Sequence, residues 1–466
     1  MSSLIAEKFI LLLCKSLAIT GLLLYVLSTL LFNQPFDLFP PSTHKFSASN
    51  PLSNAPTNIT HLVFGIAGSV NTWIHKKPYV ETWWQPNITR GYLFLDRAPP
   101  EDFLPWPSSL PPFQVSQDTS KFEVYSKHVM PLVIRIARMV LETFREENEG
   151  VRWYVMGDDD TIFFVDNLVE VLARYDHTKY FYVGANSECV KSNFDHSFDM
   201  AFGGAGYALS YPLAAALATN LDGCINKYPY LYVSDQILQS CLADLGVSLT
   251  QEKGFHQIDL HNDISGLLSA HPESPLISLH HLDAVDPIFP SMNRHQSINH
   301  LMKATRADHS RVLQQTICYH KQSNWSFSIS WGYSAHIYES IFPRSILRKP
   351  LETFTPWKKT RSPSYMFNTR FLSNDPCEAP HVFLFDSIEN TTKDHIVMSY
   401  IRTWPRGLPV CELNGNHSAD SISKIQVISS RKHGEGERRR ECCDVVPVVT
   451  KNVTEVKFRT CMKIEE

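Results

Sequence analysis

Three consecutive carboxylates, Asp158, Asp159 and Asp160, are the residues of this sequence best placed to do chemistry. They follow a run from Val151 to Met156 whose aromatic and β-branched residues predict a buried strand, which we expect Gly157 to end. Like charges this close repel one another unless a cation answers them. Because alternate residues of an extended segment face the same way, Asp158 and Asp160 can converge on one hard divalent cation that also holds phosphate oxygens. For the triplet alone, the alternative is a solvated acidic turn or a helix cap.

A glycine-rich stretch forms the second candidate site, and it consists of Gly203, Gly204, Ala205 and Gly206. Residues without side-chain bulk that tolerate positive φ allow a substrate to approach the backbone closely. An ordinary loop before the helix expected from Tyr211 explains the stretch equally well when it is seen alone.

Two further polar groups follow along the chain. Asp235 lies at the start of a helix expected to run to Leu245, where capping is the default role of an acid. An expected strand that begins at Leu276 ends in His280 and His281, close to Asp283. Two histidines beside an acid are candidate metal ligands.

The elements around these residues predict an α/β lobe followed by a β-rich region. Strands are expected at 61–68 and 91–96, with a helix at 72–84 between them, which is the rhythm of a nucleotide-binding lobe. A further helix is expected at 127–147, with Arg135 and Arg138 on its solvated face. Beyond about residue 290, alternation at 325–331 predicts a half-buried strand, and prolines and cysteines punctuate the remainder.

Composition sets the class of protein. The chain has 466 residues, 43% of them hydrophobic and 19% charged, with a formal net charge of −4. A chain of this length can bury a large core in more than one lobe. Its near-neutral balance argues against nucleic acid as a partner.

The N-terminal residues predict a membrane anchor. Residues 16–32 carry no charge, and an apolar run from Phe9 to Cys14 extends the stretch past Lys15. The combined length suits a bilayer span, because Lys15 could snorkel to the headgroups. A cleaved signal peptide is the alternative, but no A-x-A site follows the run. We therefore expect a cytoplasmic tail at 1–8, a transmembrane signal anchor at 9–32 and a stem at 33–58.

Sequons and cysteines agree with a lumenal body. N-glycosylation sequons occur at Asn58, Asn87, Asn324, Asn390, Asn416 and Asn452. All cysteines but one of the ten lie beyond the anchor, as expected for disulfides in an oxidising compartment. Their odd number leaves at least one cysteine free or paired between chains. The adjacent Cys442 and Cys443 should have separate partners.

The ordered set of motifs resembles the Fringe-like glycosyltransferases of family 31, and especially their plant Fringe-related group. The set comprises Asp-Asp-Asp at 158–160, Gly-Gly-Ala-Gly at 203–206, Ser-Asp at 234–235 and His-Leu-Asp at 281–283. The resemblance implies a GT-A-type (Rossmann-like) fold, a twisted mixed α/β sheet flanked by helices. It implies a catalytic domain at 59–290 and a smaller, cysteine-containing β-rich region at 291–466.

The same resemblance implies roles for individual residues. Asp160 would ligate Mn²⁺ or another divalent cation, and His281 would be the second protein ligand. Asp158 or Asp159 would contact the ribose or metal-bound water, with Asp158 also a candidate ligand. The stretch 203–206 would line the pocket for the donor sugar and acceptor. Asp235 would be the catalytic base, although Gln236 replaces the second acid of that family motif.

The expected function is a membrane-anchored, metal-dependent inverting glycosyltransferase. It would pass a hexosyl or N-acetylhexosaminyl group from a UDP-sugar to a hydroxyl of a glycan or glycoprotein acceptor. The expected location is the Golgi membrane, single-pass and type II, with the catalytic region in the lumen. One alternative is a non-catalytic lumenal glycan-binding protein on a transferase fold, and another is a structural calcium-binding module.

Overall fold

The computed structural model describes residues 19, 20, 22, 55–120, 122, 132–271, 275–390, 395–411, 418–430, 441–446 and 452–462. The chain divides into two compact units, Met1–Ala55 and Pro56–Glu466. The expected tail and most of the expected anchor and stem lie outside the described residues. Within the described part, no helix combines the length and apolarity that a membrane crossing requires.

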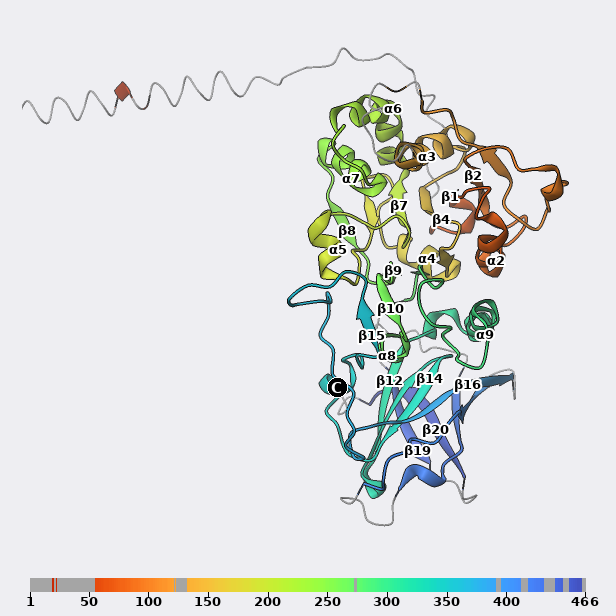
Figure 1. Ribbon diagram of the computed structural model, residues 1–466, viewed down its shortest axis with the longest axis vertical. Helices are drawn as coiled ribbons and strands as arrows, with labels where there is room; N and C mark the ends of the chain where they lie inside the picture. The colour runs from red at the N-terminus through yellow and green to blue at the C-terminus, as the bar shows by residue number, and fades with distance from the viewer. Residues whose placement is uncertain are drawn as a thin grey trace, which may run out of the picture. The chain divides into compact units, whose positions relative to one another are not determined.

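A seven-stranded mixed sheet carries the N-terminal half of the second unit (Figure 1). Its strands are β1 (Leu62–Ala67), β2 (Arg90–Leu95), β3 (Phe113–Val115), β4 (Trp153–Asp158), β6 (Tyr182–Gly184), β7 (Tyr207–Ser210) and β8 (Leu249–Gln251). They are ordered β3-β2-β1-β4-β7-β6-β8. The first four are parallel, whereas β7 runs antiparallel to both β4 and β6. The expected α/β class with a mixed sheet is confirmed.

Helices cover both faces of this sheet. They are α2 (Trp73–Trp83), α3 (Leu132–Glu146), α4 (Val165–Leu172), α5 (Val190–Asp195), α6 (Tyr211–Lys227) and α7 (Ser234–Asp244). Helices α3, α6 and α7 pack with Val63 and Tyr154 on one face. Helices α2 and α4 pack with Phe64 and Val155 on the other. Adjacent strand residues point to opposite faces, so β1 and β4 are buried on both sides.

Two local expectations about this half were wrong. Gly157 does not end β4 but lies within it. A Cβ atom there would lie 2.8 Å from the Phe163 ring, so the glycine makes room for a neighbour rather than for a turn. Arg138 is not solvated: its side chain is 1% exposed and pairs with Glu142 and Asp222, which satisfies a charge buried inside the helical layer.

An eight-stranded sheet forms most of the C-terminal half. Its strands are β12 (Gln315–His320), β13 (Trp325–Ser330), β14 (Ser334–Tyr338), β16 (His381–Asn390), β17 (His395–Arg402), β18 (Lys424–Ser430), β20 (Val453–Thr460) and β19 (Glu441–Val446), in spatial order. All neighbours are antiparallel except β18 and β20. The edge strands β12 and β19 also contact each other, so the sheet curls round until its two edges meet. Unpaired strand edges invite association with other chains, and this closure covers them.

Strand β13 is buried along its whole length, which corrects the half-buried prediction. Its aromatic side chains enter the core as expected. Its serines face a second covered surface, where Ser326 Oγ donates to the Ser340 carbonyl and Ser330 Oγ donates to the Leu268 carbonyl. The polar residues of this alternating pattern therefore hydrogen-bond to protein groups rather than to water.

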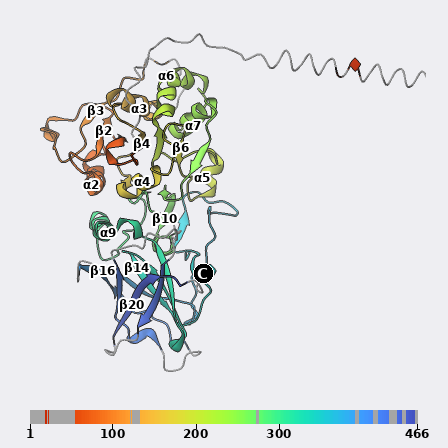
Figure 2. The same cartoon turned by 180° about the vertical axis from the view of Figure 1, so that it is seen from behind.

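Two short sheets and three helices join the halves. The three-stranded sheet consists of β5 (Ile162–Phe163), β11 (Ser278–Leu279) and β9 (Phe255–His256), and the two-stranded ribbon of β10 (Leu260–Asn262) and β15 (Phe354–Pro356). The helices are α8 (Ser265–Ser269), α9 (Arg294–Ala307) and α10 (Arg344–Leu347). Figure 1 shows β10 and β15 between the two large sheets, and Figure 2 shows β10 there from behind. One hydrophobic core runs through both halves.

The disulfides agree with the pairing expected from the number of cysteines. Bonds join Cys224 to Cys241, Cys318 to Cys443, Cys377 to Cys411, and Cys442 to Cys461. The separate partners expected for Cys442 and Cys443 are confirmed. Among the described residues one cysteine, Cys189, is free and buried.

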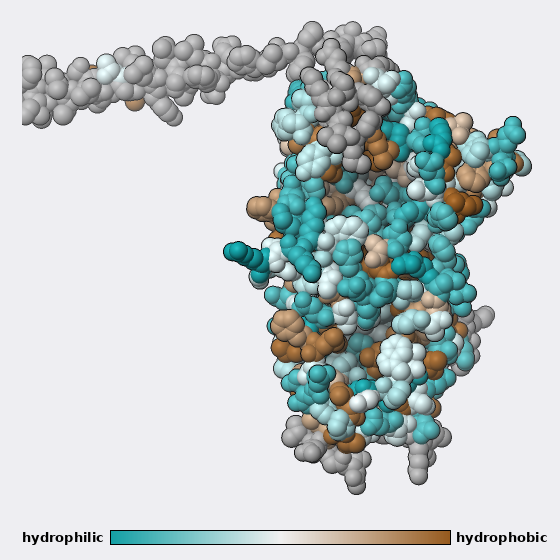
Figure 3. All heavy atoms as spheres, in the orientation of Figure 1, coloured by the Kyte–Doolittle hydropathy of each residue, from teal (hydrophilic) through white to brown (hydrophobic). Residues whose placement is uncertain are grey.

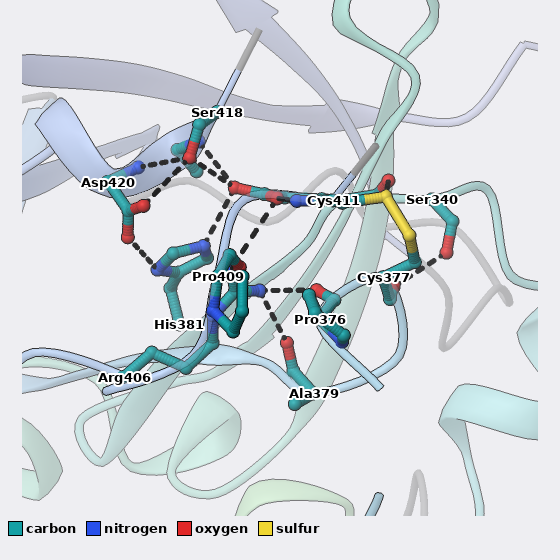
Figure 4. Close-up of polar contacts among 12 residues, drawn as sticks. Ser340, Pro376, Cys377, Ala379, His381, Arg406, Pro409, Cys411, Ser418 and Asp420 are labelled. Carbon is teal, nitrogen blue, oxygen red and sulfur yellow. Dashed lines mark hydrogen bonds and ion pairs between the residues drawn. A yellow bond between two sulfur atoms is a disulfide. The ribbon is translucent and has the colours of Figure 1, made fainter. Parts of the chain in front are cut away.

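Glu339 is the polar centre of the C-terminal half (Figure 4). It follows β14 and its side chain is fully buried. Its carboxylate accepts hydrogen bonds from His381 Nε2 at 2.9 Å and from Ser418 Oγ at 2.9 Å. The backbone N–H groups of Ala419 and Cys411 also donate to it, at 2.7 and 3.2 Å. One carboxylate therefore fastens three separate segments to the sheet.

Replacing Glu339 by Gln should lower the free energy of unfolding at pH 7 by roughly 3 kcal/mol, because the substitution removes the buried negative charge that the surrounding donors stabilise. Burial alone would raise the pKa of Glu339, but the bonds from His381 and Ala419 outweigh it and lower the pKa to about 2. The carboxylate therefore stabilises the fold fully above its ordinary pKa of 4.5 and loses this effect as the pH falls toward 2. Urea titrations should show the gap between wild type and Glu339→Gln narrowing from pH 5 to pH 3. The exposed Glu378→Gln is the matched control, and an equal loss in both variants would contradict the role of Glu339.

Candidate active site

The acidic triplet lies where the central strand β4 ends. Strand β4 has parallel β1 on one side and antiparallel β7 on the other. The Asp159 N–H donates to the carbonyl of Ala67 at the end of β1, at 2.9 Å. In α/β sheets, ligands bind outside the carboxyl ends of parallel strands, at the point where strand order reverses. The triplet occupies such a point.

Asp158, Asp160 and His280 together form a possible metal site. Their ligand atoms lie within 4.8 Å of one another. His280 Nε2 is 3.2 Å from Asp160 Oδ1 and 3.7 Å from Asp158 Oδ2. The side chains of Asp160 and His280 are 7% and 5% exposed, whereas Asp158 keeps 36%. The cluster is thus closed on the protein side and open at Asp158.

His280, rather than the expected His281, joins the two carboxylates. Strand β11 ends at Leu279, and the backbone turns at His281, whose φ is 53°. The His281 ring lies against the His280 ring, but its Nδ1 meets a different carboxylate, 3.2 Å from Asp259 Oδ1. The structure thus brings a histidine of this pair to the acidic triplet, and that histidine is His280 rather than the expected His281.

Lys76, in the helix that follows β1, is the residue at this site that the sequence did not reveal. Its Nζ donates to Asp160 Oδ2 at 2.5 Å and to Asp283 Oδ2 at 2.6 Å. It therefore bridges the acidic triplet to the acid of the His-Leu-Asp motif. The available signal was its place in the first helix after a parallel strand, where basic residues meet anionic ligands.

The charges of the cluster shift its pKa values in opposite directions. The surrounding protein removes water from these carboxylates, even from the partly exposed Asp158, and this desolvation raises the pKa of Asp158 to about 7 and of Asp159 to about 8. The neighbouring carboxylates add to both effects. Burial would raise the pKa of Asp160 too, but His280 and Lys76 outweigh it and hold that pKa well below its ordinary value. Asp160 is therefore the carboxylate that stays ionised throughout, as a firm cation ligand should.

The donor set fits a hard divalent cation. Two carboxylates and one imidazole are oxygen and nitrogen donors of the kind that Mn²⁺ or Mg²⁺ accepts. Buried atoms without a hydrogen-bond partner among the described residues include Asp159 Oδ2 and His280 Nδ1. Lys76 compensates only part of the carboxylate charge at this site. A bound cation would relieve the remaining repulsion.

The glycine turn packs directly against the other functional groups. A Cβ atom at Gly203 would lie 2.5 Å from Asp235 Oδ1, and one at Gly204 would lie 2.2 Å from His280 Cε1. Gly206 has a φ of 87°, a conformation that favours glycine. Ala205 is held by its N–H, which donates to Gln257 Oε1 at 2.7 Å. The turn therefore brings the carboxylate and the imidazole close to one backbone.

Asp235 faces this turn from the first turn of α7. Its Oδ2 accepts the N–H of Gly203 at 2.8 Å, so the side chain does not cap its own helix. Burial raises the pKa of Asp235, and the bond from Gly203 offsets part of that rise. Asp158 and Asp235 also line one small hollow. Gln236, at the departure from the family motif, donates to the carbonyl of His196 at 3.1 Å.

A tryptophan from the C-terminal half completes the site. The Trp357 ring lies between two histidine rings, with centroids 4.7 Å from His281 and 4.6 Å from His261. The backbone N–H of Trp357 donates to the backbone carbonyl of Asp259 at 2.9 Å. His281 in turn lies against His280, with ring centroids 3.9 Å apart. The stack thus links residue 357 to the metal-site imidazole.

Comparison with known proteins places the chain in a family. Residues 192–443, which are more than half of the 466, match the family described as "Protein of unknown function, DUF604". The chain belongs to this family.

A named relative gives that family membership a chemical context. The chain is 25% identical over 191 residues to "Beta-1,3-N-acetylglucosaminyltransferase lunatic fringe" of Danio rerio, which is 38% of this chain and 48% of the relative. The chain thus spans about half the length of this curated relative. The resemblance to Fringe-like glycosyltransferases is confirmed.

One solved structure is similar at a lower level. It is "Mannosyltransferase PcManGT from Pyrobaculum calidifontis in complex with GDP-Man and Mn2+", with a TM-score of 0.27 and 9% identity. The similarity covers 45% of this chain and 59% of that one.

Trp357→Ala should weaken Mn²⁺ binding about tenfold, as is typical when the support of a metal ligand is removed. Without the indole, the His281 ring loses its stacking partner and no longer fixes His280. The rise in melting temperature across a Mn²⁺ titration measures this effect. Trp357→Phe retains an aromatic face and should restore most of the affinity. If Trp357→Ala and wild type gave the same Mn²⁺ midpoint, the positioning role would be refuted.

Proposed function

We propose that this protein is a metal-dependent glycosyltransferase that moves a sugar from a UDP-sugar to a hydroxyl group of a glycan or glycoprotein. The observation that carries the proposal is the pairing of two carboxylate sites across one glycine turn. Gly204 packs against His280 of the Asp158–Asp160–His280 cluster, and Gly203 packs against Asp235. The similarity to an N-acetylglucosaminyltransferase supports it.

The first carboxylate site suits the donor diphosphate. Asp158, Asp160 and His280 would hold a divalent cation, which when bound neutralises charge on the departing diphosphate. Lys76 lies within hydrogen-bonding distance of Asp160 and Asp283 and adds a second positive charge at the same place. A leaving group stabilised in this way needs no separate general acid.

The second site suits proton removal from the acceptor. As the acceptor oxygen bonds to the anomeric carbon, the bond from that carbon to the diphosphate oxygen breaks and its electron pair leaves with the diphosphate. The acceptor proton passes to Asp235. A carboxylate whose pKa is raised by burial is a stronger base, which favours this transfer. Attack opposite the leaving group inverts the anomeric centre.

Two other candidates are weaker. A non-catalytic glycan-binding protein on a transferase fold draws support from Gln236, whose amide is committed to His196 and adds no second acid. A structural calcium module explains the triplet but not the contacts between the glycine turn and Asp235. The transferase proposal accounts for both sets of residues.

We also propose that the protein is a single-pass type II protein of the Golgi membrane, anchored through residues 9–32, with its catalytic region in the lumen. Four disulfides in the described residues support an oxidising compartment. Four of the expected sequons are exposed, at Asn58, Asn87, Asn324 and Asn452.

Digestion with an N-glycosidase should therefore lower the apparent mass of the full chain made in eukaryotic cells. Replacing Asn87 by Gln should reduce this decrease in mass by the mass of one glycan, because the Asn87 side chain is exposed and free to carry a glycan. A mass unchanged by the enzyme would argue against the lumenal location.

Asp160→Asn should abolish the Mn²⁺-dependent rise in melting temperature that a UDP-sugar produces, because the firmest cation ligand is lost. Asp235→Asn should keep that rise and lower the transfer rate about a hundredfold or more, the usual contribution of a general base. Donor binding is read by thermal shift, and transfer by release of UDP with an acceptor glycan.

The exposed Asp176→Asn is the control, which should match wild type in both assays. Loss of donor binding in Asp235→Asn to the same extent as in Asp160→Asn would remove Asp235 as the base. A lack of any Mn²⁺-dependent response to nucleotide sugars in the wild type would overturn the proposed function.

A further inference from the structure

A second cavity, of about 560 Å³, lies in the C-terminal half of the second unit. This volume falls within the roughly 300–1,000 Å³ of typical ligand sites. Its lining includes Asp263, Tyr333, Arg370, Phe371 and Trp404. None of the acidic triplet, the glycine turn or Asp235 lines it. The cavity is therefore separate from the candidate active site.

The β10–β15 ribbon connects this cavity to the active site. At one end of the ribbon, Trp357 bonds to Asp259, whose carboxylate lies beside His281. At the other end, Thr353 Oγ1 donates to the carbonyl of Asp263 at 2.7 Å, and both residues line the cavity. The two ends are four positions apart on each strand, a span of no more than about 14 Å. The cavity and the residues that support the candidate metal site are therefore joined by one short ribbon.

The mouth of the cavity carries exposed apolar side chains. Trp404 is 47% exposed, Phe371 83% and Leu372 62%. In Figure 3, apolar side chains gather in patches among polar ones over the part of the molecule that β12–β16 occupy. Flat, exposed aromatic faces next to polar groups suit the C–H faces and hydroxyls of sugar rings.

Polar groups in the lining are available for hydrogen bonding. Within the part of the chain that the structure describes, Arg370 binds the Lys349 carbonyl through Nε and the Tyr338 hydroxyl through Nη2, which leaves Nη1 without a partner. The Trp404 indole N–H and the Asn374 carboxamide likewise have no protein partner there. Groups of this kind fix the orientation of a bound ligand.

The charges of the lining balance. Arg370 and Arg406 are matched by Asp263 and Glu378. His336 adds no charge near neutrality, because burial, reinforced by the charge of Arg370, lowers its pKa to about 3. Because Arg406 is also paired with the buried Glu339, the lining has no excess positive charge for an anionic ligand, and a neutral ligand needs none.

The wall is also preorganised. Arg406 is 4% exposed, donates to the carbonyls of Pro376, Ala379 and Pro409, and lies 3.6 Å from Glu339 (Figure 4). Its segment is held further by the Cys377–Cys411 disulfide. The Glu339 centre described above thus fixes the segment that presents Trp404, which lowers the entropy that binding must cost.

We propose that this cavity binds a neutral oligosaccharide, and that the bound chain is the part of the acceptor remote from the hydroxyl that reacts. The second clause rests on the proposed function, whereas the binding itself does not. Trp404 and Phe371 would stack on sugar rings, and Arg370 and Asn374 would bond to hydroxyls.

The test uses the folded wild-type chain and a size series of neutral cello-, xylo- and galacto-oligosaccharides. Saturation-transfer NMR and calorimetry measure binding. Trp404→Ala and Phe371→Ala should each weaken binding about tenfold or more, as truncation of a central aromatic residue does in other interfaces. Tyr180→Ala is the matched control, because Tyr180 is 48% exposed and lies outside the cavity.

Asp160→Asn separates this inference from the proposed function. Oligosaccharide binding that survives Asp160→Asn and fails in Trp404→Ala supports the cavity, whether or not donor binding is found. Trp404→Phe should restore most of the affinity. This recovery would show that Trp404→Ala loses binding because the aromatic ring is missing, and not because the protein misfolds. Equal binding by wild type, Trp404→Ala and Phe371→Ala, or no binding of any oligosaccharide in the series, would overturn the inference and leave the donor site untouched.

Discussion

Three carboxylates at the end of a buried strand set the electrostatic problem that the surrounding structure answers. Strand β4 delivers Asp158, Asp159 and Asp160 to one place, where their mutual repulsion and burial oppose ionisation. Lys76 and His280 compensate one of them, Asp160. The other two keep raised pKa values. Helix α2 and the turn after β11 thus bring Lys76 and His280 to the carboxylate that they compensate.

The neighbourhood of the carboxylates is fixed by shape as much as by charge. Gly203 and Gly204 touch Asp235 and His280 so closely that a single Cβ atom would overlap either group. Sites of this kind conflict locally with stability, since they bury charge and use residues of high backbone entropy. A site for an anionic ligand requires such locally unfavourable features, and the helices on both faces of the sheet stabilise them.

Much of the N-terminal half follows from sequence periodicity. The strand and helix expected at 61–68 and 72–84 occur as β1 and α2. The continuous apolar run explains the strand, because β1 is buried on both faces of the sheet. Periodicity could not show that Arg138 finds acidic partners inside the helical layer, or that the serines of β13 face covered backbone. Both outcomes depend on residues distant in sequence.

The candidate site shows the same division. Residue types indicated the acidic triplet, the glycine turn and a histidine pair, because their chemistry is local. The choice of His280 over His281 depends on a backbone turn with positive φ, and the contribution of Lys76 depends on how α2 sits over the sheet. Trp357 lies more than 70 residues beyond His281 in the sequence, and it reaches His281 through a ribbon that no local sequence pattern predicts.

That ribbon also bears on how such a chain can change over evolutionary time. Because β15 and Trp357 come from the C-terminal half yet stack on a residue next to His280, the two halves do not behave as interchangeable modules. A recombination event near residue 290 would separate the histidine pair from its aromatic support and cut through the shared hydrophobic core. Inheritance of the chain as a single block is the course that this architecture favours.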